Sequence, residues 1–445
     1  MHLPKLQIDH AATSTAPGLL FLGEKGGKSK PSDAVIADNQ GRVVWEYEAP
    51  NGLEITDFRA QAYRGKPVLT WWQGTISKAG VGTGSYLVYD AAYRKIASVK
   101  AGHDLAGDLH EFQLTPRGTA FLSVYREVPY DLSGVGGPKH GFAYDSVVQE
   151  VNVATRKVVF EWHSLDHVGL SESLQANQEP ALHASDKRPF DYFHVNSIAD
   201  GPDGTILISG RNTSALYLIR RDGSIAWRLG GKRSDFTIVP GAEFSFQHDV
   251  RRHADGTLTI FDNNAADPAS TAPARPIRLA LDMGAMTATL VREYRPANPP
   301  TAWAMGNVEQ LPDGGVFVGW GTAGSFTEFA PDGTVRFDAA LADGSSTYRA
   351  FRASWVGKPT ELPRVAVTRD SRGAVAHVSW NGATEVATWR ADLGSYGKPF
   401  RPVAAAPRSA FETTLRLGHR TGLLAVTALD AAGKALGRSA VHWLV

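Results

Sequence analysis

The sequence of 445 residues contains no cysteine, and this absence excludes several kinds of chemistry at once. Without thiols there is no thiolate nucleophile, no disulfide bridge and no cysteine-ligated metal site. The absence fits both oxidising and reducing compartments, so it leaves the location of the protein open.

Long apolar runs and an excess of one charge are also missing. No stretch reaches the roughly 18 consecutive apolar residues that predict a membrane span. The 46 basic and 45 acidic side chains leave a formal net charge of +1, with no long run of either sign. Because nucleic-acid and membrane-surface binders normally carry a concentrated basic patch, we expect neither kind of partner.

The first residues lack the pattern of a secretory leader, in which a charged segment precedes an apolar one. We therefore expect a cytoplasmic protein, or a secreted or cell-envelope protein if a leader has been removed. The sequence does not indicate an oligomeric state.

What the chain does contain is a repeated unit of short apolar runs separated by tight turns, which is typical of an all-β fold. The clearest copy runs from Phe193 to Gly231 and has turns at Asp203-Gly204 and Asp222-Gly223. The other copies begin near Pro17, Pro67, Leu109, Phe246 and Gly306. Six units of four antiparallel strands predict a six-bladed β-propeller.

This repeat sets the expected domain boundaries. We expect an N-terminal extension at 1–16, a propeller at 17–358 and a small fibronectin-III-like β-sandwich at 359–445, where short alternating strands contain Trp380 and Trp389. A large β-sandwich or a β-helix is the alternative to the propeller. The constant offset between the first strand and its turn favours the propeller.

Histidines occupy the same place in three successive units. In a propeller the first strand of each blade lines the central channel, and its start opens on one mouth of that channel. His110, His194 and His248 stand at such starts, and Asn307 takes the matching place in a fourth unit. Because side chains alternate along a strand, the neighbours Glu111, Val195 and Asp249 are expected on the opposite face.

Arg211 is expected to join these histidines. It ends the second strand of the unit that His194 begins, and a hairpin brings those two positions side by side. A cation among imidazoles suits an anionic oxyacid such as sulfate or phosphate.

Each of these features has a plainer interpretation. A single propeller histidine is often a structural hydrogen bonder, and three histidines can hold a catalytic zinc. These three histidines form no HxH or HxxxH pair with one another, and a metal site gains nothing from an adjacent arginine, so we expect no metal. The histidines at 163 and 167 and the tryptophans at 71 and 72 lie in clusters that are more often packing than chemistry.

At these residues the sequence resembles the arylsulfotransferase family, whose members need no nucleotide sulfate donor. The resemblance rests on LHEFQLTPRGTAF, FHVNSI…ISGRNTSALY, GGKRSDF and FQHDVRRHADGTLTIFDN. It runs from about residue 17 to 357 and extends further to WNGATEVATW, at 380–389, which is similar to the actinobacterial and fungal branch.

The resemblance implies transfer of a sulfuryl group from a phenolic sulfate ester to another phenol, without an external cofactor. It implies that His248 is the sulfated nucleophile and that His110, His194 and Arg211 surround the sulfuryl group. The chain departs from the enterobacterial type, because it lacks a disulfide and a separate N-terminal β domain. The Ser-Arg-His turn of that type reads Gly210-Arg211-Asn212 here.

Phenolic substrates require aromatic contacts at the channel mouth. The candidates, together with Asn307, are Trp72, Tyr125, Tyr192, Trp303 and Trp320. Two other functions stay open: a biosynthetic cyclase or isomerase that uses the same histidines and arginine on an aromatic or polycyclic substrate, and a non-catalytic binding propeller.

Overall fold

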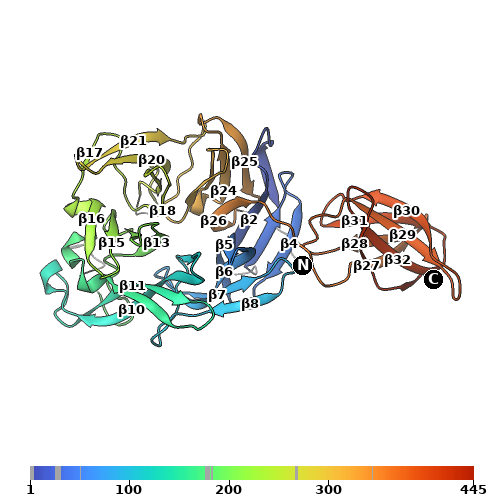
Figure 1. The fold of residues 1–445 in the computed structure, drawn as a ribbon, viewed down its shortest axis with the longest axis horizontal. Coiled ribbons are helices and arrows are strands. Elements are labelled where there is room, and N and C mark those ends of the chain that lie inside the picture. The colour runs from blue at the N-terminus through green and yellow to red at the C-terminus, as the bar shows by residue number, and fades with distance from the viewer. Residues whose placement is uncertain are drawn as a thin grey trace.

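The structure, a computed structural model, describes residues 5–25, 32–50, 52–175, 181, 184–265, 269–342 and 344–444. Over these residues the chain forms eight β-sheets, of which six come from residues 6–353 and two from residues 364–444. Figure 1 shows the six sheets around a common centre and the other two as a separate body beside them. The architecture is all-β and propeller-like.

The first three sheets are made of neighbouring strands, with one strand supplied from far along the chain. The first sheet has the order β26 (Ser346–Ala353), β2 (Leu19–Lys25), β3 (Asp33–Ala37), β4 (Val43–Glu48). The second contains β5 (Glu54–Tyr63), β6 (Lys66–Ile76), β7 (Gly82–Tyr89) and β8 (Lys95–Val99). The third contains β9 (Phe112–Leu114), β10 (Thr119–Tyr130), β11 (Gly141–Asn152) and β12 (Val158–His163).

The next three sheets follow the same plan. The fourth contains β13 (Val195–Asp200), β14 (Ile206–Gly210), β15 (Ala215–Ile219) and β16 (Ile225–Gly230). The fifth contains β18 (His248–Arg252), β19 (Leu258–Asp262), β20 (Arg275–Asp282), β21 (Thr287–Glu293) and the short parallel β17 (Thr237–Ile238). The sixth contains β22 (Asn307–Gln310), β23 (Val316–Gly319), β24 (Ser325–Phe329), β25 (Val335–Leu341) and β1 (Leu6–His10).

The two C-terminal sheets face a core of their own. One contains β27 (Arg364–Asp370), β28 (Gly373–Ser379) and β31 (Glu412–Gly418). The other contains β30 (Arg401–Pro407), β29 (Thr388–Gly394), β32 (Gly422–Leu429), β33 (Ala435–Arg438) and β34 (His442–Leu444). The 3-10 helices of the described residues are η1 (Ser133–Val135), η2 (Ser164–Asp166), η3 (Leu170–Glu172), η4 (Gly231–Arg233) and η5 (Gly321–Ala323).

Both faces of the first six sheets are buried, because each consecutive pair of sheets shares one apolar core. Strand β2 shows how the sequence achieves this. Leu20 and Leu22 pack into the core shared with the sixth sheet, whereas Phe21 packs into the core shared with the second. Side chains of a strand alternate between its faces, so an uninterrupted apolar run serves two cores.

The predicted turns of the fourth sheet are present. Gly204 and Gly223 have φ values of 79° and 87°, a left-handed conformation that glycine adopts without strain. Their backbone N–H groups donate to the carbonyls of Gly201 and Arg220 at 3.1 and 3.0 Å.

The first and sixth sheets each combine strands from the N-terminal and the C-terminal ends of residues 6–353. β26 pairs antiparallel with β2, from Leu19↔Ala353 to Lys25↔Ser346. β1 pairs antiparallel with β25 and becomes the outer strand of the sixth sheet. The expected N-terminal extension at 1–16 therefore contributes a strand to the sixth sheet.

The centre of the six sheets is filled by buried charges. Arg349 of β26 donates to Asp57 of β5 at 2.9 Å and to Glu111 at 3.3 Å. Arg251 of β18 donates to Glu111 at 2.7 Å and to Asp249 at 2.6 Å. Glu111 and Asp249 were expected to point away from their neighbouring histidines, and these ion pairs place them at the centre. The network ties four sheets together.

The C-terminal body is joined to the first two sheets by short polar contacts. Asn381 exchanges hydrogen bonds with the backbone of Glu46, at 3.0 and 2.9 Å. The Tyr93 hydroxyl donates to the Gly382 carbonyl at 2.8 Å. Over the described ranges, no helix is long and apolar enough to cross a bilayer.

Candidate active site

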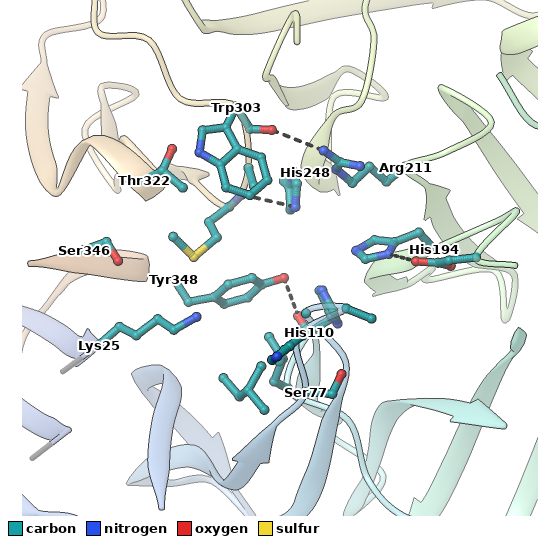
Figure 2. A pocket seen from close by; sticks show the side chains of 18 of the residues that line it. Lys25, Ser77, His110, His194, Arg211, His248, Trp303, Thr322, Ser346 and Tyr348 are labelled. Atoms are coloured by element: carbon teal, nitrogen blue, oxygen red, sulfur yellow. Dashed lines mark hydrogen bonds and ion pairs between the residues drawn. The ribbon is translucent and has the colours of Figure 1, made fainter. Parts of the chain in front are cut away.

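A cavity of about 880 Å³ opens where the inner strands of the six sheets begin. Its lining brings together His110, His194, His248 and Arg211, which come from three different sheets. Figure 2 shows these four side chains directed toward one another across the cavity, with Tyr348 between His110 and His248. Two backbone positions at this site, His194 and Met305, have left-handed φ values of 60° and 65°, a conformation that costs free energy in residues with a Cβ.

His248, the first residue of β18, is held in one tautomer by its neighbours. The amide of Asn263 donates to the carbonyls of Ala302 and Met305 at 2.7 and 3.0 Å, which turns its oxygen toward His248. The His248 Nδ1 lies 2.6 Å from that oxygen and must therefore be the donor. We infer that Nε2 carries the lone pair.

The surroundings keep His248 uncharged. Burial lowers the pKa of its imidazole well below the usual value, the Arg211 cation lowers it further, and the hydrogen bond to Asn263 opposes the shift. The Met305 N–H donates to Nε2 at 3.3 Å, which agrees with an unprotonated nitrogen at that position. A neutral imidazole is a competent nucleophile, and the Met305 hydrogen bond to Nε2 must be given up when the lone pair attacks.

His110 and His194 differ from His248 in the group that binds Nδ1. The His110 Nδ1 lies 2.5 Å from a carboxylate oxygen of Asp108, and the His194 Nδ1 lies 2.5 Å from one of Asp191. Burial lowers the pKa of His194, and the Asp191 carboxylate opposes this shift. A carboxylate partner stabilises an imidazolium where an amide does not, so these two rings are suited to accept and return a proton.

The rings of His110 and His194 lie edge to face, with centroids 4.7 Å apart. Two positive charges this close repel each other strongly in a buried site.

Arg211 supplies the permanent charge of the site. Its backbone N–H donates to the His194 carbonyl at 3.0 Å, as expected for a residue that ends the paired strand. The guanidinium donates to the Asn212 side chain at 2.9 Å and to the Trp303 carbonyl at 3.2 Å. These acceptors are uncharged, so the cation remains available to an anion in the cavity.

The six other side chains expected at the channel mouth lie in different places. Trp303 lines the cavity and is 37% exposed. Tyr125 packs against His110 and His194, with ring centroids 5.5 and 5.4 Å away, and its hydroxyl donates to the Val195 carbonyl at 2.8 Å.

Tyr125 and the remaining four do not line the cavity. Trp72, Tyr192 and Trp320 are fully buried in the cores between sheets. Asn307 uses its amide to bond the backbone of Ala350, at 2.8 and 2.9 Å. The reason for the three aromatic side chains is two-faced burial, since large apolar rings are drawn into the cores between sheets.

Several functional residues were missed by sequence reasoning. They are Asp108, Asp191, Asn263 and Tyr348. Asn263 had a usable signal, because it follows the second strand of its sheet as Arg211 does. Asp108 and Asp191 precede their histidines by two and three residues, but only the backbone path shows that they turn back onto the rings. Within the described residues, no group of three or more acidic or histidine side chains is arranged to hold a metal ion.

Comparison with known proteins gives a family and distant structural relatives. No curated protein matches the chain. A protein of unknown function from Bacteroides caccae shares 13% identity, covering 76% of this chain and 100% of its own, with a TM-score of 0.46. The periplasmic gluconolactonase of Pseudomonas aeruginosa shares 15% identity, covering 96% and 99%, with a TM-score of 0.38. A catalytically inactive virginiamycin B lyase from Staphylococcus aureus with quinupristin shares 10% identity, covering 85% and 97%, with a TM-score of 0.36.

Structural likeness at this level says nothing about the reaction. The sequence of residues 59–342, by contrast, matches the family described as arylsulfotransferase (ASST). This span includes the three histidines and the arginine of the cavity, and covers more than half of the chain. The chain belongs to the arylsulfotransferase family.

Proposed function

We propose that this protein transfers a sulfuryl group from a phenolic sulfate ester to a phenol, through a sulfated His248, on a six-bladed propeller (17–358) that carries a fibronectin-III-like sandwich (359–445). One observation carries the proposal: Asn263 orients His248 so that Nε2 is unprotonated, in the lining of a cavity that also contains the Arg211 guanidinium.

The first half of the reaction forms the sulfated enzyme. The His248 Nε2 attacks sulfur, the new N–S bond forms, and the bond from sulfur to the phenolic oxygen breaks. Arg211 stabilises the negative charge on the sulfuryl oxygens. The leaving phenolate takes a proton from the imidazolium of His110 or His194, each of which is supported by a carboxylate.

The second half regenerates the free enzyme. The imidazole that gave up its proton now removes one from the acceptor phenol. The phenol oxygen attacks sulfur, the N–S bond breaks, and His248 is again neutral. Protons and charge balance over the cycle. Tyr348 and Trp303 offer aromatic contacts for the two phenolic rings in turn.

The direct test is incubation with p-nitrophenyl sulfate, with and without phenol. Without acceptor, we expect a burst of about one equivalent of p-nitrophenol and an acid-labile adduct of about 80 Da on the peptide that contains His248. Phenol should then sustain turnover. A folded enzyme that gives no burst with any activated aryl sulfate would contradict sulfotransfer, and cyclisation in the same cavity would become the leading function.

The burst should also show an unusual pH dependence. Since the pKa of His248 is well below its usual value, the burst rate with p-nitrophenyl sulfate should stay constant from about pH 8 to about pH 6, where a free imidazole becomes protonated. The p-nitrophenolate leaves without needing a proton, so the acid–base histidines do not affect this range. Stopped-flow absorbance at several pH values measures the rate.

A single substitution should make the burst rate depend on the protonation of His248. In Asn263→Asp a carboxylate replaces the amide beside Nδ1, which raises the pKa of His248, so the rate should fall as the pH decreases below about 7. Asn264→Asp adds the same charge one residue away at an exposed position and should leave the profile flat. A wild-type rate that already falls about tenfold between pH 7.5 and pH 5.5 would show that His248 titrates normally.

A further inference from the structure

The cavity lining carries more positive charge than one sulfate ester requires. Among the described residues of the lining, the lysines and arginines are Lys25, Lys78, Arg188 and Arg211, and the carboxylate is Asp191. Asp191 is already bonded to His194. An aryl sulfate bears a single negative charge, which Arg211 can stabilise beside His248. The other three cations, called here the mouth cations, have no part in the transfer step.

Lys25 is the mouth cation whose side-chain direction can be seen in Figure 2. It ends β2 and pairs in the sheet with Ser346 of β26. Figure 2 shows its side chain extending into the cavity toward Tyr348. Its Nζ lies 4.0 Å from a carboxylate oxygen of Glu54, at the outer limit of an ion pair. This loose contact leaves the ammonium able to bind an anion in the cavity.

Lys78 and Arg188 lie on two other segments and are exposed, which places them at the open side of the cavity. Lys78 belongs to the turn between β6 and β7, where the Ser77 N–H donates to the Val81 carbonyl at 2.8 Å. Arg188 belongs to a turn closed by two reciprocal backbone hydrogen bonds with Ser185, each 3.0 Å long. These backbone hydrogen bonds fix the turns that carry both residues.

We propose that the phenolic substrate of this enzyme carries a second acidic group, and that the mouth cations bind it while the phenolic oxygen lies at His248. The volume supports a substrate longer than one ring, since about 880 Å³ is near the upper end of the roughly 300–1,000 Å³ that holds drug-sized ligands. This inference rests on the proposed sulfotransfer for the reacting oxygen, but binding of the acidic group can be measured without it.

General electrostatic steering is the competing explanation for these cations. Steering raises the association rate of every anion and depends on total charge rather than on position. A specific site, in contrast, discriminates between two ligands of equal size that differ in one acidic group. It also depends on these three residues rather than on any three cations.

The experiment compares 4′-hydroxybiphenyl-4-carboxylate with its carboxamide, using the full chain. Binding of each is measured by titration calorimetry without a donor, and the KM of each as acceptor is measured with p-nitrophenyl sulfate. We expect about tenfold tighter binding and a similarly lower KM for the carboxylate, as about two- to fivefold per partly exposed ion pair implies. The 4-phosphate and 4-sulfonate analogues identify which acid is preferred.

Variants separate the explanations. Replacing all three mouth cations, in Lys25→Gln with Lys78→Gln and Arg188→Gln, should bring the ratio of carboxylate to carboxamide affinity close to one. Lys95→Gln with Arg220→Gln and Lys434→Gln removes the same charge at exposed positions outside the lining and should keep the wild-type ratio.

Each outcome decides the proposal. A wild-type ratio near one, with normal transfer to both acceptors, overturns the second acidic group and leaves sulfotransfer standing. A preserved ratio without any transfer supports the acid site and refutes the reaction. Equal loss of the ratio in both triple variants shows steering and overturns the proposal.

Discussion

His248→Ala is expected to abolish both the burst of p-nitrophenol and the sulfated peptide, and to lower turnover by about 10⁴-fold or more. The side chain that would form the covalent bond is lost, and the other two histidines of the cavity are oriented differently. His110 and His194 are oriented by carboxylates that suit them to proton transfer. Quenched-flow measurement of phenol release and mass spectrometry of the His248 peptide test this directly.

Two further variants distinguish the loss of the nucleophile from a loss of folding. His253→Ala removes an imidazole five residues away on the same sheet, where its Nε2 bonds the Thr259 hydroxyl, and should leave the burst intact. His248→Gly leaves space for free imidazole, which should restore part of the phenol release. A normal burst in His248→Ala would assign the nucleophile to another residue.

Arg211→Lys should lower kcat by about 10²-fold while changing the thermal unfolding midpoint little. The substitution keeps the positive charge but replaces a planar group of several donors with a single ammonium, which cannot bond two sulfuryl oxygens in the same way. The guanidinium also donates to the Trp303 carbonyl, so lysine would loosen the segment that contacts His248.

The matched control is Arg220→Lys, which makes the same exchange at an exposed residue of the same sheet and should have wild-type kcat. Differential scanning fluorimetry checks that both variants fold. Wild-type turnover in Arg211→Lys would refute a role for its planar geometry in stabilising the sulfuryl group.

The parts of the fold that follow from local pattern were predictable from the sequence. Turn-forming pairs such as Asp203-Gly204 repeat at a fixed distance from apolar runs. This spacing predicted the strands, and it predicted that the three histidines occupy equivalent positions in their repeats. The pairing of β2 with β26 was not predictable in this way. Leu19 and Ala353 meet across more than three hundred residues of chain, and no local signal specifies such a partner.

The location of a site residue was predictable where its position in a strand alone determines the direction of its side chain. It was not predictable where the path of the backbone between strands determines that direction. His248 and Arg211 lie at strand ends, so a hairpin places them. Asp108 and Asp191 lie in connecting segments, where a left-handed residue such as His194 sets the direction of the chain. Trp72 was expected at the mouth because it is large and aromatic, but its neighbour Trp71 fills the opposite core, and alternation sends Trp72 into the other.

The buried charge network gives β26 a role in the timing of assembly. During synthesis, the segments with Asp57, Glu111 and Asp249 emerge well before Arg349, the cation that lies against all three. Until it arrives, three carboxylates face one another with only part of their counter-charge, and desolvating them is costly. We therefore expect a nascent chain to keep its ring open, and to gain its cavity wall at Tyr348 in the same step that neutralises the centre. Enzymatic competence would then appear abruptly, as β26 inserts.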